Sequence, residues 1–173
     1  MSALTAEQVI GLLTSYTRET GASVEVLLVG ALALQAYGYQ DRLTRDLDAE
    51  VVGPIEALTE FLSRHSIPAD LTTNFSGSIV AMPPGYRDRA TDLVHQANLH
   101  VRLLAPIDFV IAKLRRGTDL DLDDASFVAN RFHLTTDHIR KAAAAAIDAS
   151  PKDTALFLFQ KTVDLFCKSL AGP

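Results

Sequence analysis

One segment constrains the fold of this sequence more than any other: Ser23 to Val52 combines a predicted strand, a glycine, a helix and a second strand. The run SVEVLLVG is short, apolar and rich in strand-forming residues, and it stops at Gly30. ALALQAY follows with high helix propensity, and Gly38 is a suitable C-terminal cap. RDLDAEVV then alternates polar and apolar residues, which is typical of a half-buried strand. This order predicts a mixed α/β front half.

Asp46 and Asp48 fall in the second predicted strand, on either side of Leu47. Residues two apart in a strand point to the same face, so the two carboxylates should project together. Neighbouring carboxylates repel unless a proton or a cation lies between them, and Mg²⁺ prefers oxygen ligands of this kind. With substrate phosphates completing the metal's shell, the pair suits phosphoryl or nucleotidyl transfer. The alternative is a pair of solvated surface carboxylates.

Gly30 offers the second part of the same chemistry. A strand that ends in glycine and turns directly into a helix presents backbone N–H groups, here those of Ala31 and Leu32. Such a helix start can bind a phosphate, although a glycine at a strand end is also an ordinary turn residue. The combination predicts a phosphate cradle beside a metal site.

The segments around this unit complete a predicted front half. Thr5 to Glu19 reads as a helix opened by a capping pattern, and Pro54 begins the helix PIEALTEFLSRH. LTTNFSGSIVAM predicts a hairpin or two short strands around Gly77, PPGYRDRA a loop entering a short helix, and NLHVRLLA a strand.

From Pro106 onward every segment reads as helix. We therefore expect an α/β core over residues 1–104 and a helical part over residues 105–173, packed together as one domain. In the last helix Phe157, Phe159, Leu165 and Phe166 spread over more than one face, which fits either core packing or docking on a second chain.

Composition limits the class of protein. The chain has 173 residues, 48% of them hydrophobic and 21% charged, which is typical of a well-packed globular domain. Its net charge of −5 argues against broad electrostatic binding to nucleic acid. The single cysteine excludes a disulfide framework, and the sequence shows neither a membrane span nor a signal peptide. We expect a cytoplasmic protein.

GALALQAYGYQDRLTRDLD resembles the signature of the DNA-polymerase-beta-like nucleotidyltransferase superfamily. It is most similar to the bacterial AbiEii-like and related minimal nucleotidyltransferases, whose pattern is GG-x-AL, a Tyr-Gly, and then Arg-x-Thr-x-Asp-x-Asp. Four residues fit that last pattern position by position: Arg42, Thr44, Asp46 and Asp48.

LLAPIDFVIAKLRRGTDLDLDDAS resembles a later motif of the same group. The matching positions are Asp108, Lys113, Arg116, Gly117, Asp121 and Asp124. Lys113 to Arg116 could alternatively be the solvated end of a helix, where cations complement the helix dipole. An internal pairing of Lys113 with Asp121 or Asp124 is favoured over a second metal site.

The resemblance implies a mixed, twisted sheet of about four or five strands covered by helices. It also implies transfer of a nucleoside monophosphate from an NTP to a hydroxyl of a protein, a nucleic acid such as RNA, or a small molecule. Several relatives are toxins of toxin–antitoxin or phage-defence systems, so an antitoxin or a second copy of the chain is an expected partner.

The same resemblance assigns roles to residues. Asp46 and Asp48 would be catalytic and would hold Mg²⁺ or Mn²⁺, with Asp121 and Asp124 as supporting acids. The nucleotide and its phosphates would be bound by Gly30, Ala31, Arg42, Thr44, Lys113 and Arg116.

The sequence departs from the family pattern in two ways. Ala31 stands where the family has a second glycine or a serine, and the third carboxylate of the family has no clear counterpart. Glu50 shares the face of the pair but lies further along the same strand, and Asp70 only precedes the next predicted strand. Two hypotheses follow: an active metal-dependent nucleotidyltransferase, or a degenerate relative that binds a nucleotide or a protein without chemistry.

Overall fold

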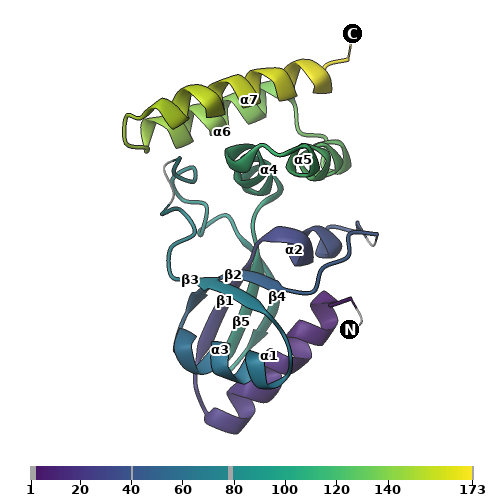
Figure 1. The fold of residues 1–173 in the computed structure, drawn as a ribbon, viewed down its shortest axis with the longest axis vertical. Helices are drawn as coiled ribbons and strands as arrows, with labels where there is room; N and C mark the ends of the chain where they lie inside the picture. Colours follow the sequence, from purple (N-terminus) through teal and green to yellow (C-terminus); the bar gives the residue numbers. More distant parts are fainter. Residues whose placement is uncertain (1–2, 40, 78–79, 173) are drawn as a thin grey trace. The chain divides into compact units, whose positions relative to one another are not determined.

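The computed structural model describes residues 3–39, 41–77 and 80–172, which form two compact units (Figure 1). The sheet unit comprises Met1–Phe75 and Ala90–Leu104, and the helical unit comprises Ser76–Arg89 and Ala105–Pro173. The chain passes between the units at the predicted boundary after residue 104, but the helical unit also takes in Ser76–Arg89. That the two parts form one domain stays a prediction.

Among its described residues, the sheet unit holds five strands and three helices. Its elements are α1 (Ala6–Thr20), β1 (Val24–Leu28), α2 (Gly30–Ala36), β2 (Leu47–Val52), α3 (Ile55–Arg64), β3 (Ala69–Thr72), β4 (Thr91–Gln96) and β5 (Leu99–Leu103). The strands form one mixed sheet in the order β3-β2-β1-β5-β4. β1 is antiparallel to β2 and parallel to β5, while β3 runs parallel to β2 and β4 antiparallel to β5. The predicted α/β fold with a mixed sheet is confirmed.

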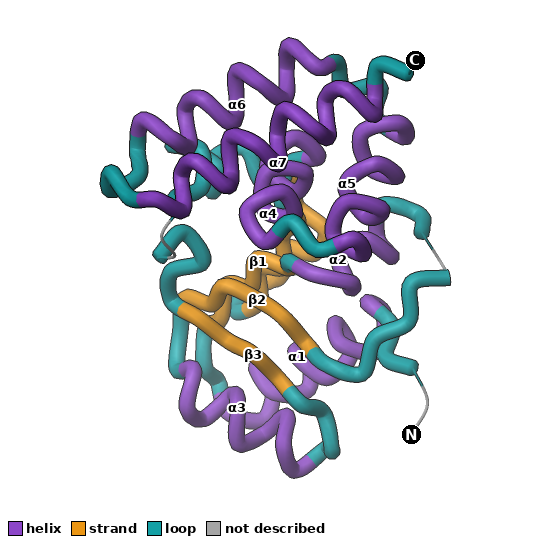
Figure 2. Tube along the Cα trace, turned by 45° about the horizontal axis from the view of Figure 1, so that its top comes forward, coloured by secondary structure: helices purple, strands orange, loops and turns teal. Residues whose placement is uncertain are grey.

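One face of this sheet is apolar. Leu47, Ala49 and Val51 alternate along β2, and all three are buried. Figures 1 and 2 show α1 and α3 lying against one side of the sheet. The two helices meet through Tyr16 and Phe61, whose rings pack edge to face with centroids 5.2 Å apart. Burial of these side chains supplies the core of the unit.

The other, polar face carries most of the charged and polar groups of the strands, together with Leu27 and Val52. Cross-strand partners share a face, so the register assigns the following residues to it: Glu25, Asp48, Glu50, Asp70, Thr72, His100 and Arg102. Alternation in the central strands therefore separates an apolar core face from a face that can carry chemistry.

The helical unit contains four helices: α4 (Pro106–Arg116), α5 (Asp119–Arg131), α6 (Thr136–Asp148) and α7 (Thr154–Leu170). All four were predicted. α6 and α7 lie side by side in both views (Figure 2). The last helix divides its aromatic residues, since Phe159 and Phe166 are buried while Phe157 is 68% exposed.

An ion pair ties the segment before β4 to the start of α4. The Arg89 guanidinium donates to both carboxylate oxygens of Asp108, at 2.9 and 2.8 Å, and also to the carbonyl of Pro84 at 2.8 Å. Asp108 is fully buried, so this two-point contact supplies the counter-charge that its carboxylate needs.

Three local predictions were wrong, and one strand was missed. Around Gly77 the described residues hold the single strand β3 instead of a hairpin, and residues 78–79 of that prediction lie outside them. The predicted short helix in PPGYRDRA is a series of turns held by the Arg89 contacts. β4 was not predicted, because it is almost wholly exposed and lacks an apolar alternation. Pro54 is the residue before α3 and not its first member.

The exchange Arg89→Met should lower the free energy of unfolding by about 2–3 kcal/mol, because it leaves the buried Asp108 carboxylate without its counter-ion. Urea unfolding at pH 7 measures this. Lys152→Met, at an exposed position before α7, should change stability by less than about 0.5 kcal/mol. Equal effects of the two exchanges would contradict a stabilising role for the pair.

Candidate functional site

Asp48 is the strand residue on which the candidate site is built. It stands second in β2, on the polar face, and is half buried. Its backbone carbonyl accepts a hydrogen bond of 3.2 Å from the N–H of Val29, the residue that follows β1. Antiparallel pairing of β1 with β2 therefore brings the Asp48 carboxylate to the point where the chain leaves the sheet for α2.

Gly30 lies against that carboxylate. Its φ is +64°, a left-handed conformation that residues with a side chain rarely adopt. A Cβ atom on Gly30 would also lie 3.1 Å from the Asp48 Cβ and would collide with the carboxylate itself. Both the backbone angle and the close approach require glycine, so Gly30 and Asp48 form one structural unit. Ala31 follows as the second residue of α2.

The prediction that Asp46 lies within the strand was wrong: it falls in the bend just before β2, so strand alternation does not set its direction. Thr44 positions it instead, because the Thr44 hydroxyl donates a hydrogen bond to the Asp46 carboxylate. Thr44 is itself held by an isolated bridge in which its carbonyl accepts from the N–H of Leu4 at 2.8 Å. The structure thus places Thr44 next to a candidate metal ligand.

The loop that carries these residues is fixed from α2. The Gln35 amide donates to the carbonyl of Arg42 at 2.8 Å and to that of Leu4 at 3.2 Å. Arg42 is half buried, two residues before Thr44. The second turn of α2 therefore determines where the Arg-x-Thr-x-Asp segment runs.

Asp70 is the carboxylate that sequence reasoning left without a role. In the parallel pair of β2 and β3 it is the direct partner of Asp48, so the two side chains share the polar face on adjacent strands. Asp70 is exposed. The alternation Ala69-Asp70-Leu71 was the signal that could have identified it, but β3 has only four residues.

Glu50, the next residue of β2 on this face, has a different role. It is 4% exposed, and its carboxylate accepts a hydrogen bond of 2.6 Å from the N–H of Phe75. That bond anchors the chain that leaves β3. Glu50 therefore positions the backbone that follows β3 beside the polar face.

A second cluster of predicted residues lies in the helical unit. The Lys113 ammonium is buried and donates to Asp124 at 2.7 Å and to Asp121 at 3.2 Å. Arg116 adds an ion pair of 3.3 Å to Asp121. The predicted pairing of Lys113 with the two following aspartates is confirmed, and a phosphate role of Lys113 and Arg116 stays a prediction.

Asp121 is the most constrained member of this cluster. Burial alone would raise the pKa of its carboxyl. The Thr118 hydroxyl donates to it at 2.7 Å, and together with the two neighbouring cations it holds that pKa below its usual value. Thr118 also caps α5, because its oxygen accepts from the Asp121 N–H.

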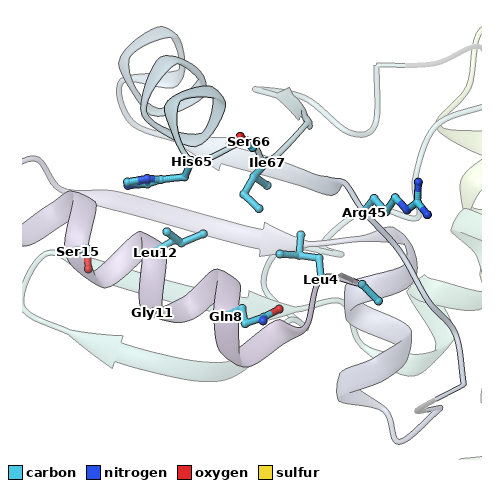
Figure 3. A pocket seen from close by; sticks show the side chains of 10 residues that line it. Leu4, Gln8, Gly11, Leu12, Ser15, Arg45, His65, Ser66 and Ile67 are labelled. Atoms are coloured by element: carbon cyan, nitrogen blue, oxygen red, sulfur yellow. The ribbon is translucent and has the colours of Figure 1, made fainter. Parts of the chain in front are cut away.

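The sheet unit also carries a separate hollow of about 500 Å³ (Figure 3). It lies between α1 and the connection from α3 to β3, and its lining residues include Leu4, Leu12, Arg45 and Ile67. The carboxylates of the candidate site do not line it. This hollow and the candidate chemistry are therefore different features of the unit.

Comparison with known proteins decides the family. A family model described as a nucleotidyltransferase of unknown function (DUF6036) matches residues 7–155. The chain belongs to this family. The membership in the nucleotidyltransferase superfamily expected from the two motifs is thereby confirmed, and the closer likeness to the AbiEii-like group stays a prediction.

Comparison with solved structures found a match of low sequence identity. It is an antigenic nucleotidyltransferase-like protein from Paracoccidioides brasiliensis, with 13% sequence identity and a TM-score of 0.49 over 88% of this chain and 96% of that chain. No curated protein matches the sequence. Among the residues that the structure describes, no helix has the length and apolar character needed to cross a membrane.

Gly30→Ala should lower the free energy of unfolding by about 2 kcal/mol, because it strains the backbone and pushes the Asp48 carboxylate aside. Gly11→Ala is the matched control, since Gly11 lies inside α1 with no atom near its missing Cβ. That change should stabilise the protein by about 0.5–1 kcal/mol. Thermal unfolding of both variants measures the contrast, and a loss of stability only in Gly11→Ala would refute it.

Lys113→Met should reverse the pH dependence of stability. In the native protein Asp121 has a lowered pKa, so its contribution is present above about pH 4 and is lost as the pH falls through the folded-state pKa. Without the ammonium, burial should raise the pKa of the Asp121 carboxyl, so the variant should become more stable as the pH falls from 7 to 5.

Urea unfolding at several pH values measures this change. At pH 7 the expected loss is about 3–5 kcal/mol. Lys161→Met, on the exposed surface of α7, is the control and should keep the native pH profile. A Lys113→Met protein with that same native profile would contradict the role of the buried cluster.

Proposed function

We propose that the chain is a metal-dependent nucleotidyltransferase that moves a nucleoside monophosphate from an NTP to a hydroxyl of an acceptor. The observation that carries the proposal is the register of Asp48 with Asp70 beside Gly30. Family membership gives the reaction class, and this register supports Asp70 as the third carboxylate that the motifs alone lacked.

The donor set fits Mg²⁺ or Mn²⁺. Asp46, Asp48 and Asp70 offer only carboxylate oxygens, and they are exposed or half buried, so water and phosphate oxygens can complete a shell. Asp46 and Asp48 would hold the ion. When bound, it would neutralise charge on the triphosphate and on the leaving group.

Other residues of the chain would serve the remaining steps of the reaction. Asp70 would accept the proton of the acceptor hydroxyl, whose oxygen then forms a bond to the α-phosphorus of the NTP. The bond from that phosphorus to the bridging oxygen breaks, and pyrophosphate leaves. The missing side chain at Gly30 lets the Asp48 carboxylate lie against the start of α2, where phosphate would bind, and Thr44 would keep Asp46 oriented during the reaction.

Ala31 supports a second candidate, a relative that binds nucleotide or partner without transfer. It keeps the backbone N–H of the family's usual glycine or serine but supplies no hydroxyl. The carboxylate register favours the active enzyme, because a binding-only protein gains nothing from a third exposed acid beside the pair.

A cellular role follows from the resemblance to AbiEii-like proteins. We propose a bacterial, cytoplasmic protein acting as the toxin of a toxin–antitoxin or phage-defence system, with a protein, RNA or small molecule as acceptor. Phe157, Leu158 and Leu165 are 57–68% exposed on α7, which supports contact with an antitoxin or a second copy of the chain.

Calorimetric titration with each NTP, with and without Mg²⁺, tests the proposal. The native protein should bind at least one NTP only with Mg²⁺ or Mn²⁺ present, and Asp46→Asn/Asp48→Asn should weaken that binding at least about 100-fold, as loss of metal ligands predicts. Asp123→Asn, at an exposed position of α5, is the control.

Asp70→Asn separates the two candidates. It should retain NTP binding but lose transfer of labelled nucleotide by about 100-fold or more, because it removes the proposed base. If no NTP binds the native protein with either cation, the transferase proposal is wrong.

A further inference from the structure

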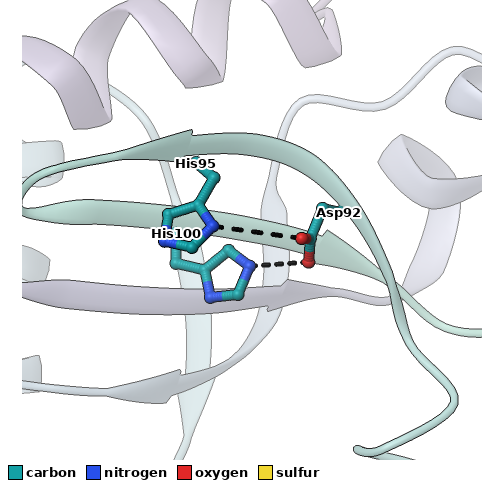
Figure 4. Close-up of side chains that lie close together, drawn as sticks. All are labelled: Asp92, His95 and His100. Carbon is teal, nitrogen blue, oxygen red and sulfur yellow. Dashed lines mark hydrogen bonds and ion pairs between the residues drawn. The ribbon is translucent and has the colours of Figure 1, made fainter.

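Three side chains that the proposed reaction does not use converge on the hairpin of β4 and β5. Figure 4 shows Asp92, His95 and His100 with their polar ends directed toward one another. His100 Nε2 lies 2.7 Å from Asp92 Oδ1, and His95 Nδ1 lies 4.0 Å from Asp92 Oδ2. One nitrogen from each ring and one carboxylate oxygen all lie within 4.8 Å of one another. Two imidazoles and a carboxylate therefore surround a single point.

An irregularity in β4 makes this convergence possible. Residues three apart in a regular strand, such as Asp92 and His95, point to opposite faces. Here Val94 pairs with Val101 and Asp92 with Arg102, so the register shifts by one residue at Leu93. This β-bulge places Asp92 on the same face as His95. His95 then pairs directly with His100, and the two rings stack with centroids 4.4 Å apart.

We propose that Asp92, His95 and His100 bind a divalent transition-metal ion, of which Zn²⁺ is the representative. Imidazole nitrogens and a carboxylate are ligands that Zn²⁺ takes at about 2.0–2.2 Å, which separates neighbouring ligand atoms by about 3.3 Å in a tetrahedron. In the structure, the distance from His100 Nε2 to Asp92 Oδ1 is shorter than this value, at 2.7 Å, and the distance from His95 Nδ1 to Asp92 Oδ2 is longer, at 4.0 Å. His95 and Asp92 are exposed, so small side-chain rotations suffice to reach it.

The surroundings of the three ligands suit a bound cation. Arg102 Nε lies 3.6 Å from Asp92 Oδ1 and would repel the ion, but the Glu25 carboxylate pairs with the same guanidinium at 3.0 Å. Arg102 also donates to the carbonyl of Ala90 at 3.1 Å, so its position is fixed from two sides. It acts as an outer partner that orients Asp92 toward the site. Three ligands from the protein leave the fourth position for water.

This site is distinct from the carboxylates of the proposed reaction. Asp48 lies level with Val29, just after β1. His100 pairs with Glu25, four residues earlier in the chain than Val29, and it belongs to β5, which lies two strands away from β2. Standard sheet spacings put the two sites roughly 17 Å apart on the polar face. Their ligands also differ in kind, because oxygen-only groups favour Mg²⁺ while imidazoles favour Zn²⁺.

Competition titration of untagged full-length protein with Zn²⁺ and a chromophoric chelator tests the site. We expect one Zn²⁺ per chain, and an affinity at least about 100-fold lower in His95→Gln/His100→Gln, since loss of direct ligands exceeds the effect of losing an outer partner. His65→Gln removes an exposed histidine of the same unit and should leave the affinity unchanged. With Co²⁺ the native protein should show the visible bands of a four-coordinate site, and the double variant should not.

Two further measurements keep the result interpretable. Thermal unfolding in EDTA should be the same for the native protein and the double variant, and added Zn²⁺ should raise the melting temperature of the native protein alone. Asp46→Asn/Asp48→Asn should keep full Zn²⁺ affinity, so failure of the transferase proposal would not affect this one. Absence of Zn²⁺ binding, or equal binding by the native protein and the double variant, would overturn the inference.

Discussion

The contact between the backbone of Gly30 and the carboxylate of Asp48 is the constraint on which the sheet unit depends. It requires a residue without a side chain, in a left-handed conformation, directly after β1. It also requires β2 to be antiparallel to β1, because only that pairing brings Asp48 level with the end of β1. The turn into α2, the position of the Arg42–Thr44 loop and the place of β3 follow from this geometry. One short approach between backbone and carboxylate thus fixes the Asp48 side chain at the start of α2.

One face of the sheet supplies stability, and the other carries the candidate functional groups. The apolar face buries Val26, Leu28 and their neighbours under α1 and α3, and it holds the unit together. The polar face places carboxylates on β2 and β3, and imidazoles on the β4–β5 hairpin. Because each strand contributes to both faces, a shift of one residue in register would exchange them. The charged residues therefore need the apolar face to fix their positions, and they contribute little to the core themselves.

Much of this arrangement could be predicted from local patterns. The strand ending at Gly30, the strand around Asp48 and the four C-terminal helices have strong signals of periodicity and capping, and all were found. The pairing of Lys113 with Asp121 or Asp124 was also predicted, and the structure has both contacts. Asp70 and β4 could not be assigned in this way. The role of Asp70 depends on a parallel pairing with β2, of which the alternation in the four residues of β3 gives only a short signal. β4 is an exposed, bulged strand without apolar alternation.

The bulge at Leu93 has a consequence beyond the side chains that it aligns. β3 and β4 are the outer strands of the sheet, and outer strands present backbone N–H and C=O groups to which another chain can add. β3 offers an edge of only four residues. The pairing of β4 with β5 is interrupted directly after the pair Asp92–Arg102, and Asp92 carries a charge at that point. A regular, uncharged β4 would invite edge-to-edge association and aggregation. The inserted residue that brings Asp92 beside two imidazoles thus also keeps the sheet from growing by strand addition.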